Sequence, residues 1–86
     1  MKKIDAPQKV IFICDGKKCG RYSKEIRSDF KELIKANGLK KNIELQYMDC
    51  TGNCKCAPVI CLQPNNIWLG ELEERDVKVI FKQYFL

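Results

Sequence analysis

Six cysteines are the most chemically specialised side chains of this 86-residue chain. Cys14 and Cys19 have four residues between them. Cys50 and Cys54 have three, with Gly52 in the middle. Thiolates are soft ligands that suit zinc and iron-sulfur clusters. The chain has no histidine, which excludes a Rieske centre and removes the commonest general base. The cysteine pairs therefore point to a metal centre rather than to acid-base catalysis.

The elements that would position these cysteines follow from hydrophobic periodicity. Residues 9–14 form a short apolar, β-branched run, which predicts a central strand buried on both faces. Apolar residues at helical spacing between Tyr22 and Ile34 predict an amphipathic helix that starts near Ser23 and stops at Asn37 and Gly38. Residues 43–48 alternate between apolar and polar, as in a strand with one buried face.

This strand, helix and strand predict one right-handed crossover with parallel strands. Cys14 and Cys50 then lie at carboxyl ends that meet at the same edge of the sheet. We therefore expect Cys14, Cys19, Cys50 and Cys54 to converge, although about thirty residues separate the two pairs.

The rest of the chain predicts a hairpin and a final helix. Two apolar runs, 59–62 and 67–72, flank a turn rich in proline and asparagine. From Glu73 onward, apolar residues recur at helical spacing behind an acidic first turn. The predicted fold class is α/β, a β-α-β unit followed by a β-hairpin and a C-terminal helix, with a four-stranded mixed sheet. We expect one domain over residues 1–86, with residues 1–8 as a polar leader.

Composition and charge exclude several classes of protein. The net charge is +5, but lysines and arginines are spread along the chain, so we expect no nucleic-acid partner. No apolar run is long enough to span a membrane. The apolar run that follows the N-terminus is too short for the hydrophobic core of a signal peptide. We therefore expect a cytoplasmic protein, in which cysteines bind metal more often than they form disulfides.

The spacing of the cysteines favours an iron-sulfur cluster over zinc and leaves zinc open. Structural zinc sites use short knuckles, often with two intervening residues, and neither pair here has that spacing. A two-iron cluster takes two cysteines per iron, which wider pairs can supply. A zinc-stabilised interaction domain is the alternative, and an iron-sulfur sensor or cluster carrier is another.

The pattern Cys14-x4-Cys19, a long gap, and Cys50-x-Gly52-x-Cys54 resembles the thioredoxin-like [2Fe-2S] ferredoxins. The segment 57–60, the Pro-Asn turn, the segment 67–70 and the closing helix resemble them too, so the likeness covers about residues 9–85. That family includes stand-alone bacterial ferredoxins and the related small iron-sulfur subunits of NADH dehydrogenase and of NAD(P)-linked hydrogenases.

The resemblance implies a thioredoxin-like fold and one [2Fe-2S] cluster per chain, bound by Cys14, Cys19, Cys50 and Cys54. It implies a one-electron carrier for redox partner proteins rather than an enzyme, and it allows a homodimer. Thiol-disulfide exchange is not implied, because the chain lacks a Cys-x-x-Cys motif.

Two cysteines are surplus to this ligand set. Cys56 lies close enough to Cys54 in sequence to exchange as a ligand, whereas Cys61 sits in an apolar run and reads as a small core residue. Basic residues flank the predicted ligands, where positive charge would raise the reduction potential and attract an acidic partner. These residues, which could equally be ordinary surface cations, are Lys17, Lys18, Arg21, Lys24 and Lys55.

Overall fold

The computed structural model describes residues 1–16, 19–49, 52 and 56–86. In chain order the elements are β1 (Lys9–Cys14), α1 (Gly20–Ala36), β2 (Ile43–Met48), β3 (Ile60–Gln63), β4 (Ile67–Leu69) and α2 (Glu74–Phe85). The four strands form one sheet in the order β2-β1-β3-β4. β1 and β2 are parallel, and the other two neighbouring pairs are antiparallel. The predicted mixed sheet and parallel crossover are confirmed.

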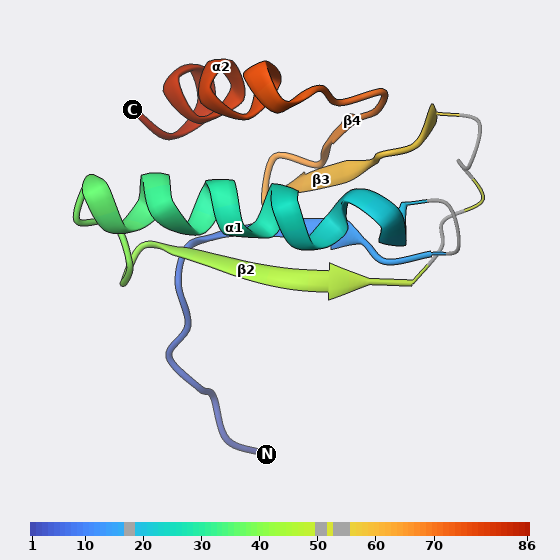
Figure 1. The fold of residues 1–86 in the computed structure, drawn as a ribbon. Coiled ribbons are helices and arrows are strands. Elements are labelled where there is room, and N and C mark those ends of the chain that lie inside the picture. The colour runs from blue at the N-terminus through green and yellow to red at the C-terminus, as the bar shows by residue number, and fades with distance from the viewer. Residues whose placement is uncertain (17–18, 50–51, 53–55) are drawn as a thin grey trace.

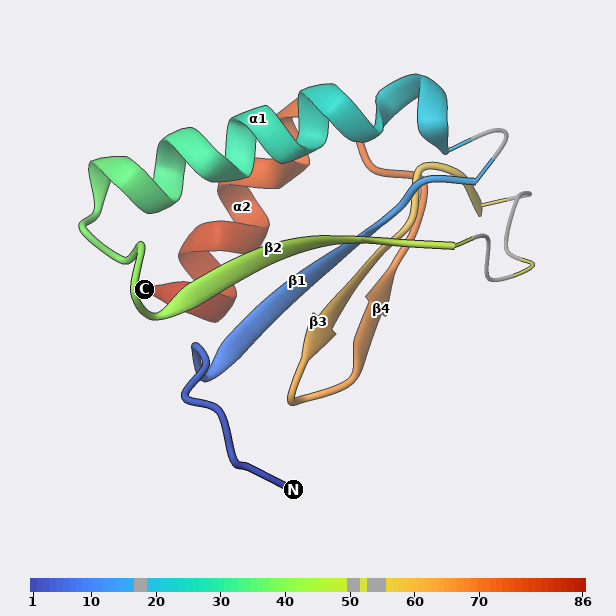
Figure 2. The ribbon, with the colours of Figure 1, turned by 90° about the horizontal axis from the view of Figure 1, so that it is seen from below.

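The molecule has two layers, because α1 and α2 lie on the same face of the sheet (Figures 1 and 2). The core between the layers is built from the helix-facing residues of the strands and from one stripe of each helix. Its most deeply buried large side chains are Ile11, Ile13, Phe30, Ile60 and Phe81. The buried positions follow a period of two along β1 and of three to four along the helices, as the sequence predicts: Ile11 and Ile13, then Ile26, Phe30 and Ile34, then Val77, Ile80 and Phe81.

The expectation that β1 is buried on both faces is wrong. Ile11 and Ile13 point toward the helices and are 0% and 1% exposed. Val10 and Phe12 point to the opposite face and are only partly buried, because both described helices lie on the other side. The continuous apolar run of β1 therefore places apolar side chains on the outer face of the sheet as well as in the core.

α1 begins at Gly20, three residues before the predicted start at Ser23. Its first turn closes when the Ser23 N–H donates to the Cys19 carbonyl oxygen at 3.1 Å. Ser23 is therefore inside the helix, where it is 1% exposed. The predicted end is confirmed: the helix stops at Ala36, and Gly38 follows with φ +65°, a conformation that glycine adopts without strain.

α2 begins directly after Glu73, as predicted. The Glu73 N–H donates to Asp76 Oδ2 at 2.8 Å, which satisfies a backbone donor that the helix start would otherwise leave without a partner. Val77 and Phe81 then pack into the core, each 1% exposed. α2 therefore lies over the sheet beside α1 (Figure 1).

Candidate metal centre

Cys14 and Cys19 lie together at the carboxyl end of β1. Each is 2% exposed, and both belong to a small apolar cluster with Val59, separate from the main core. Met48 and Ala57 pack against this cluster. The two thiols therefore lie in an environment from which water is largely excluded, and the predicted convergence with the second cysteine pair stays a prediction.

Backbone contacts on both sides fix the position of Cys14. Its N–H donates to the Val59 carbonyl oxygen at 3.1 Å, and the N–H of the next residue, Asp15, donates to the Met48 carbonyl oxygen at 2.8 Å. Cys14 Sγ lies 3.9 Å from the carbonyl oxygen of Asp49. The end of β1 is therefore tied to the residue that precedes Cys50 in the chain and to the segment that enters β3.

Cys19 is held by the start of α1, directly before Gly20. The N-terminus of a helix carries partial positive charge, which stabilises negative charge nearby. Ser23 Oγ donates to Asp15 Oδ1 at 3.0 Å, and the Gly20 N–H donates to the Gly16 carbonyl oxygen at 2.6 Å. Both bonds fasten the described ends of the loop between Cys14 and Cys19 to the first turn of the helix.

The second predicted pair, Cys50 and Cys54, lies outside the described residues, as do Lys17, Lys18 and Lys55. Gly52 is described, and its φ of +82° favours glycine. Among residues 1–16, 19–49, 52 and 56–86, no three metal-ligating side chains form a group. The described part of the chain contributes one of the two predicted ligand pairs.

The two surplus cysteines have different surroundings. Cys61 is 2% exposed and accepts a hydrogen bond from Gln63 Nε2 at 3.2 Å, so its predicted burial is confirmed. Cys56 is exposed, and its carbonyl oxygen accepts a hydrogen bond from the Glu71 N–H at 2.6 Å. A Cβ added at Gly70 would lie 2.8 Å from that oxygen and 2.9 Å from Cys56 Cβ. Sequence reasoning missed this close approach, for which a lone glycine at the end of a strand was the available signal.

Known proteins resemble this chain in sequence and in fold. No protein-family model matches the chain. A protein named "Ferredoxin, 2Fe-2S" from Clostridium pasteurianum is 29% identical over an alignment of 87 positions. The alignment covers 91% of this chain and 85% of the relative. Two structures of a thioredoxin-like [2Fe-2S] ferredoxin from Aquifex aeolicus superpose with TM-scores of 0.80 and 0.81 at 24% and 25% identity. They cover 92% of this chain, and 86% and 81% of the matched chains.

The chain has the fold of the thioredoxin-like [2Fe-2S] ferredoxins. The family resemblance drawn from the cysteine pattern and the predicted α/β fold class are both confirmed. Within the described chain, neither helix of this ferredoxin fold is long and apolar enough to cross a membrane.

The described residues fit an iron-sulfur cluster. Cys14 and Cys19 supply soft sulfur donors, they are almost completely buried, and Cys19 sits where a helix favours negative charge. The apolar side chains of Val59 and Met48 beside them form the kind of shell that controls solvent access to a metal centre. This cysteine pair is chemically compatible with the [2Fe-2S] cluster that the names of the related ferredoxins give.

Proposed function

We propose that this chain is a one-electron carrier that binds one [2Fe-2S] cluster through Cys14, Cys19, Cys50 and Cys54. The observation that carries the proposal is the buried Cys14–Cys19 pair at the carboxyl end of β1, beside the residue that precedes Cys50. A bound cluster of this type takes up and releases single electrons. The chain would convert no substrate by itself.

The residues around the site hold the ligands and set their environment. β1 ends at Cys14, and Cys19 directly precedes α1, so a regular element adjoins each thiol. Val59, Met48 and Ala57 limit access of water, and exposure to solvent is one determinant of the reduction potential of such centres. Arg21 and Lys24 are exposed on the first turns of α1, where positive charge favours the reduced state.

The partners of the carrier would be redox proteins that give and accept single electrons. We place this exchange in the cytoplasm, because a reducing compartment keeps cysteines available as ligands.

We also propose that two copies pair through the outer face of the sheet, opposite the helices. Phe12, Cys61 and Trp68 are neighbours in register across β1, β3 and β4. Phe12 is partly exposed and Trp68 is 47% exposed. An apolar row of this kind is typical of a surface that a partner covers.

The proposed ligand set is tested by single Cys→Ser changes at all six cysteines in anaerobically purified protein. Changes at Cys14, Cys19, Cys50 or Cys54 should abolish or shift the visible absorption of the cluster, because a hydroxyl is a poorer ligand for iron than a thiolate. Cys61→Ser and Cys56→Ser serve as matched controls and should leave the spectrum unchanged.

Two outcomes would contradict this assignment. One is an altered spectrum in Cys56→Ser with an unaltered spectrum in Cys54→Ser, which would move the fourth ligand to Cys56. The other is a colourless wild-type protein containing stoichiometric zinc, which would indicate a structural zinc site and an interaction domain.

A further inference from the structure

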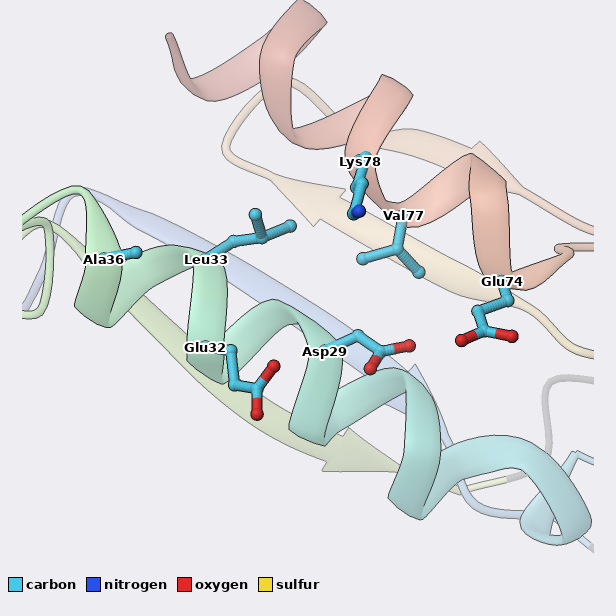
Figure 3. A pocket seen from close by; sticks show the side chains of 7 residues that line it. All are labelled: Asp29, Glu32, Leu33, Ala36, Glu74, Val77 and Lys78. Atoms are coloured by element: carbon cyan, nitrogen blue, oxygen red, sulfur yellow. The ribbon is translucent and has the colours of Figure 1, made fainter.

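The charges of α1 are divided between two sides of the helix. Arg27, Lys31 and Lys35 recur every four residues and therefore form one stripe. Asp29 and Glu32 lie on the other side, where they line a pocket of about 260 Å³ between α1 and α2. Figure 3 shows this pocket, with Asp29 and Glu32 on α1 and Glu74 and Lys78 on α2. The basic stripe faces away from α2.

A groove of about 590 Å³ runs between this basic stripe and β2. Four cations line it: Arg27, Lys31, Lys35 and Lys40. Ile34 and Leu45 form part of its apolar wall, and among the residues that the structure describes Glu44 is the one acidic residue that lines it. Lys31, Lys35 and Lys40 are exposed, and Arg27 is partly buried. The groove is therefore positively charged, with an apolar part that an organic ligand or a polypeptide could cover.

The wall opposite α1 is the edge of the sheet. β2 pairs only with β1 among the described strands, and Figure 2 shows it as the outer strand beneath α1. An edge strand presents a row of backbone N–H and C=O groups without strand partners, onto which an extended peptide can add. The basic side chains of the groove thus lie beside a strand that can pair with the backbone of an added peptide.

The groove follows β2, the strand that leads toward the candidate metal centre, and its lining on that strand ends at Leu45, three residues before Met48. The Arg27 guanidinium lies over the Tyr47 ring, 5.7 Å from its centroid. Tyr47 is paired in register with Ile13, and the next residue, Met48, is paired with Cys14. A strand rises about 3.3 Å per residue, so a segment seated against Leu45 would lie about 10 Å along the sheet from the Cys14 end of β1, and the rest of the partner protein would extend from there toward the site.

We propose that this groove docks an acidic, extended segment of a redox partner protein. This inference rests on the proposed function, because it takes the electron carrier's partner as the occupant. A nucleic acid fits less well, since a nucleic acid cannot pair its backbone with the edge strand β2 as an extended polypeptide can. A membrane surface fits less well, since the charges line a concave groove rather than a flat or convex face.

The test is a nuclear magnetic resonance titration of the ¹⁵N-labelled holoprotein with a short peptide of alternating glutamate and threonine at low ionic strength. Amide shifts should concentrate on α1 from Arg27 to Lys35 and on β2. The triple variant Lys31→Gln, Lys35→Gln, Lys40→Gln should weaken binding about tenfold, since three exposed charge pairs are lost. The matched control Lys2→Gln, Lys3→Gln, Lys82→Gln removes the same charge from exposed sites elsewhere and should bind nearly as well as wild type.

Three results would overturn the docking proposal: no binding of the peptide, equal weakening in the two triple variants, or tighter binding of an oligothymidylate of the same charge. The visible spectrum of each sample separates this proposal from the electron-carrier proposal. A coloured protein that does not bind the peptide overturns the docking site alone. A colourless protein that binds it in the groove contradicts the electron carrier and supports the groove.

Discussion

At the scale of single residues, Ser23 links the loop between two proposed ligands to the helix that follows. Its hydroxyl donates to Asp15 at 3.0 Å, and its side chain is buried at the centre of the first turns of α1. Ser23→Ala removes this bond, and Asp15, which is exposed, can find water instead. We predict a loss of about 1 kcal/mol in the free energy of unfolding.

Thermal unfolding of the holoprotein checks this prediction, with Ser28→Ala as the control. Ser28 is exposed on the same helix, so its replacement should leave stability unchanged or raise it slightly, because alanine has the higher helix propensity. Equal midpoints for the two variants would show that the Ser23–Asp15 bond contributes no stability.

Sequence patterns predict the position of a residue when a regular element contains it, and they fail for contacts between segments that are distant in sequence. Cys14 lies where the sequence predicts it, because it ends a short apolar, β-branched run that is typical of a strand. Cys19 was placed next to it, but its position at the start of α1 was missed, because Gly20 and Arg21 carry no apolar period and cysteine is not a capping residue. The contact between Gly70 and Cys56 joins segments that only the folded chain brings together.

At the scale of elements, the segment after β4 supports the segment that contains Cys56. Gly70→Ala would place a methyl group 2.8 Å from the Cys56 carbonyl oxygen, and backbone would have to move to relieve the clash. Overpacking of this kind typically costs about 1–3 kcal/mol. Because Cys56 lies two residues after Cys54, we predict that the variant also loses its cluster faster in air than wild type does.

Gly38→Ala is the control for this prediction. Its φ of +65° makes alanine unfavourable by about 1–2 kcal/mol, but an added Cβ meets no atom within 4 Å, and the residue follows the end of α1 opposite Cys19. Cluster lifetime, followed by the decay of visible absorption, should therefore stay close to the wild-type value. Equal lifetimes in both variants and wild type would show that the Gly70–Cys56 contact does not support the site.

The order of the elements can be predicted from the sequence. Which face of each strand packs against a helix and which lies on the surface cannot. β1 and β2 match the predicted residues because each is defined by its own side-chain pattern. An apolar run in β1 reads the same whether its second face packs under a helix or lies on an outer surface. The structure decides for the outer surface, and that result is the basis of the proposed pairing of two copies.

At the scale of the whole molecule, the outer face of the sheet should set the oligomeric state. Trp68→Glu places a charge in the apolar row that we propose as the dimer interface, and burying that charge would be costly. We predict a dimer for wild type and a monomer for this variant in sedimentation velocity at equal protein concentration. Both proteins should keep the same visible spectrum.

Val79→Glu is the matched control, since Val79 is 59% exposed on α2, on the helical side of the molecule. This variant should remain dimeric. A monomeric wild type, or dissociation of both variants alike, would contradict pairing through the sheet.

The most direct test of the electron-carrier proposal is electron paramagnetic resonance of the anaerobically purified protein before and after reduction with dithionite. We predict no signal from the oxidised protein and an S = 1/2 signal on reduction, with close to one spin per chain, since one electron enters one cluster. A protein that stays silent after reduction and contains zinc in place of iron would contradict the central claim and leave a structural metal site in its place.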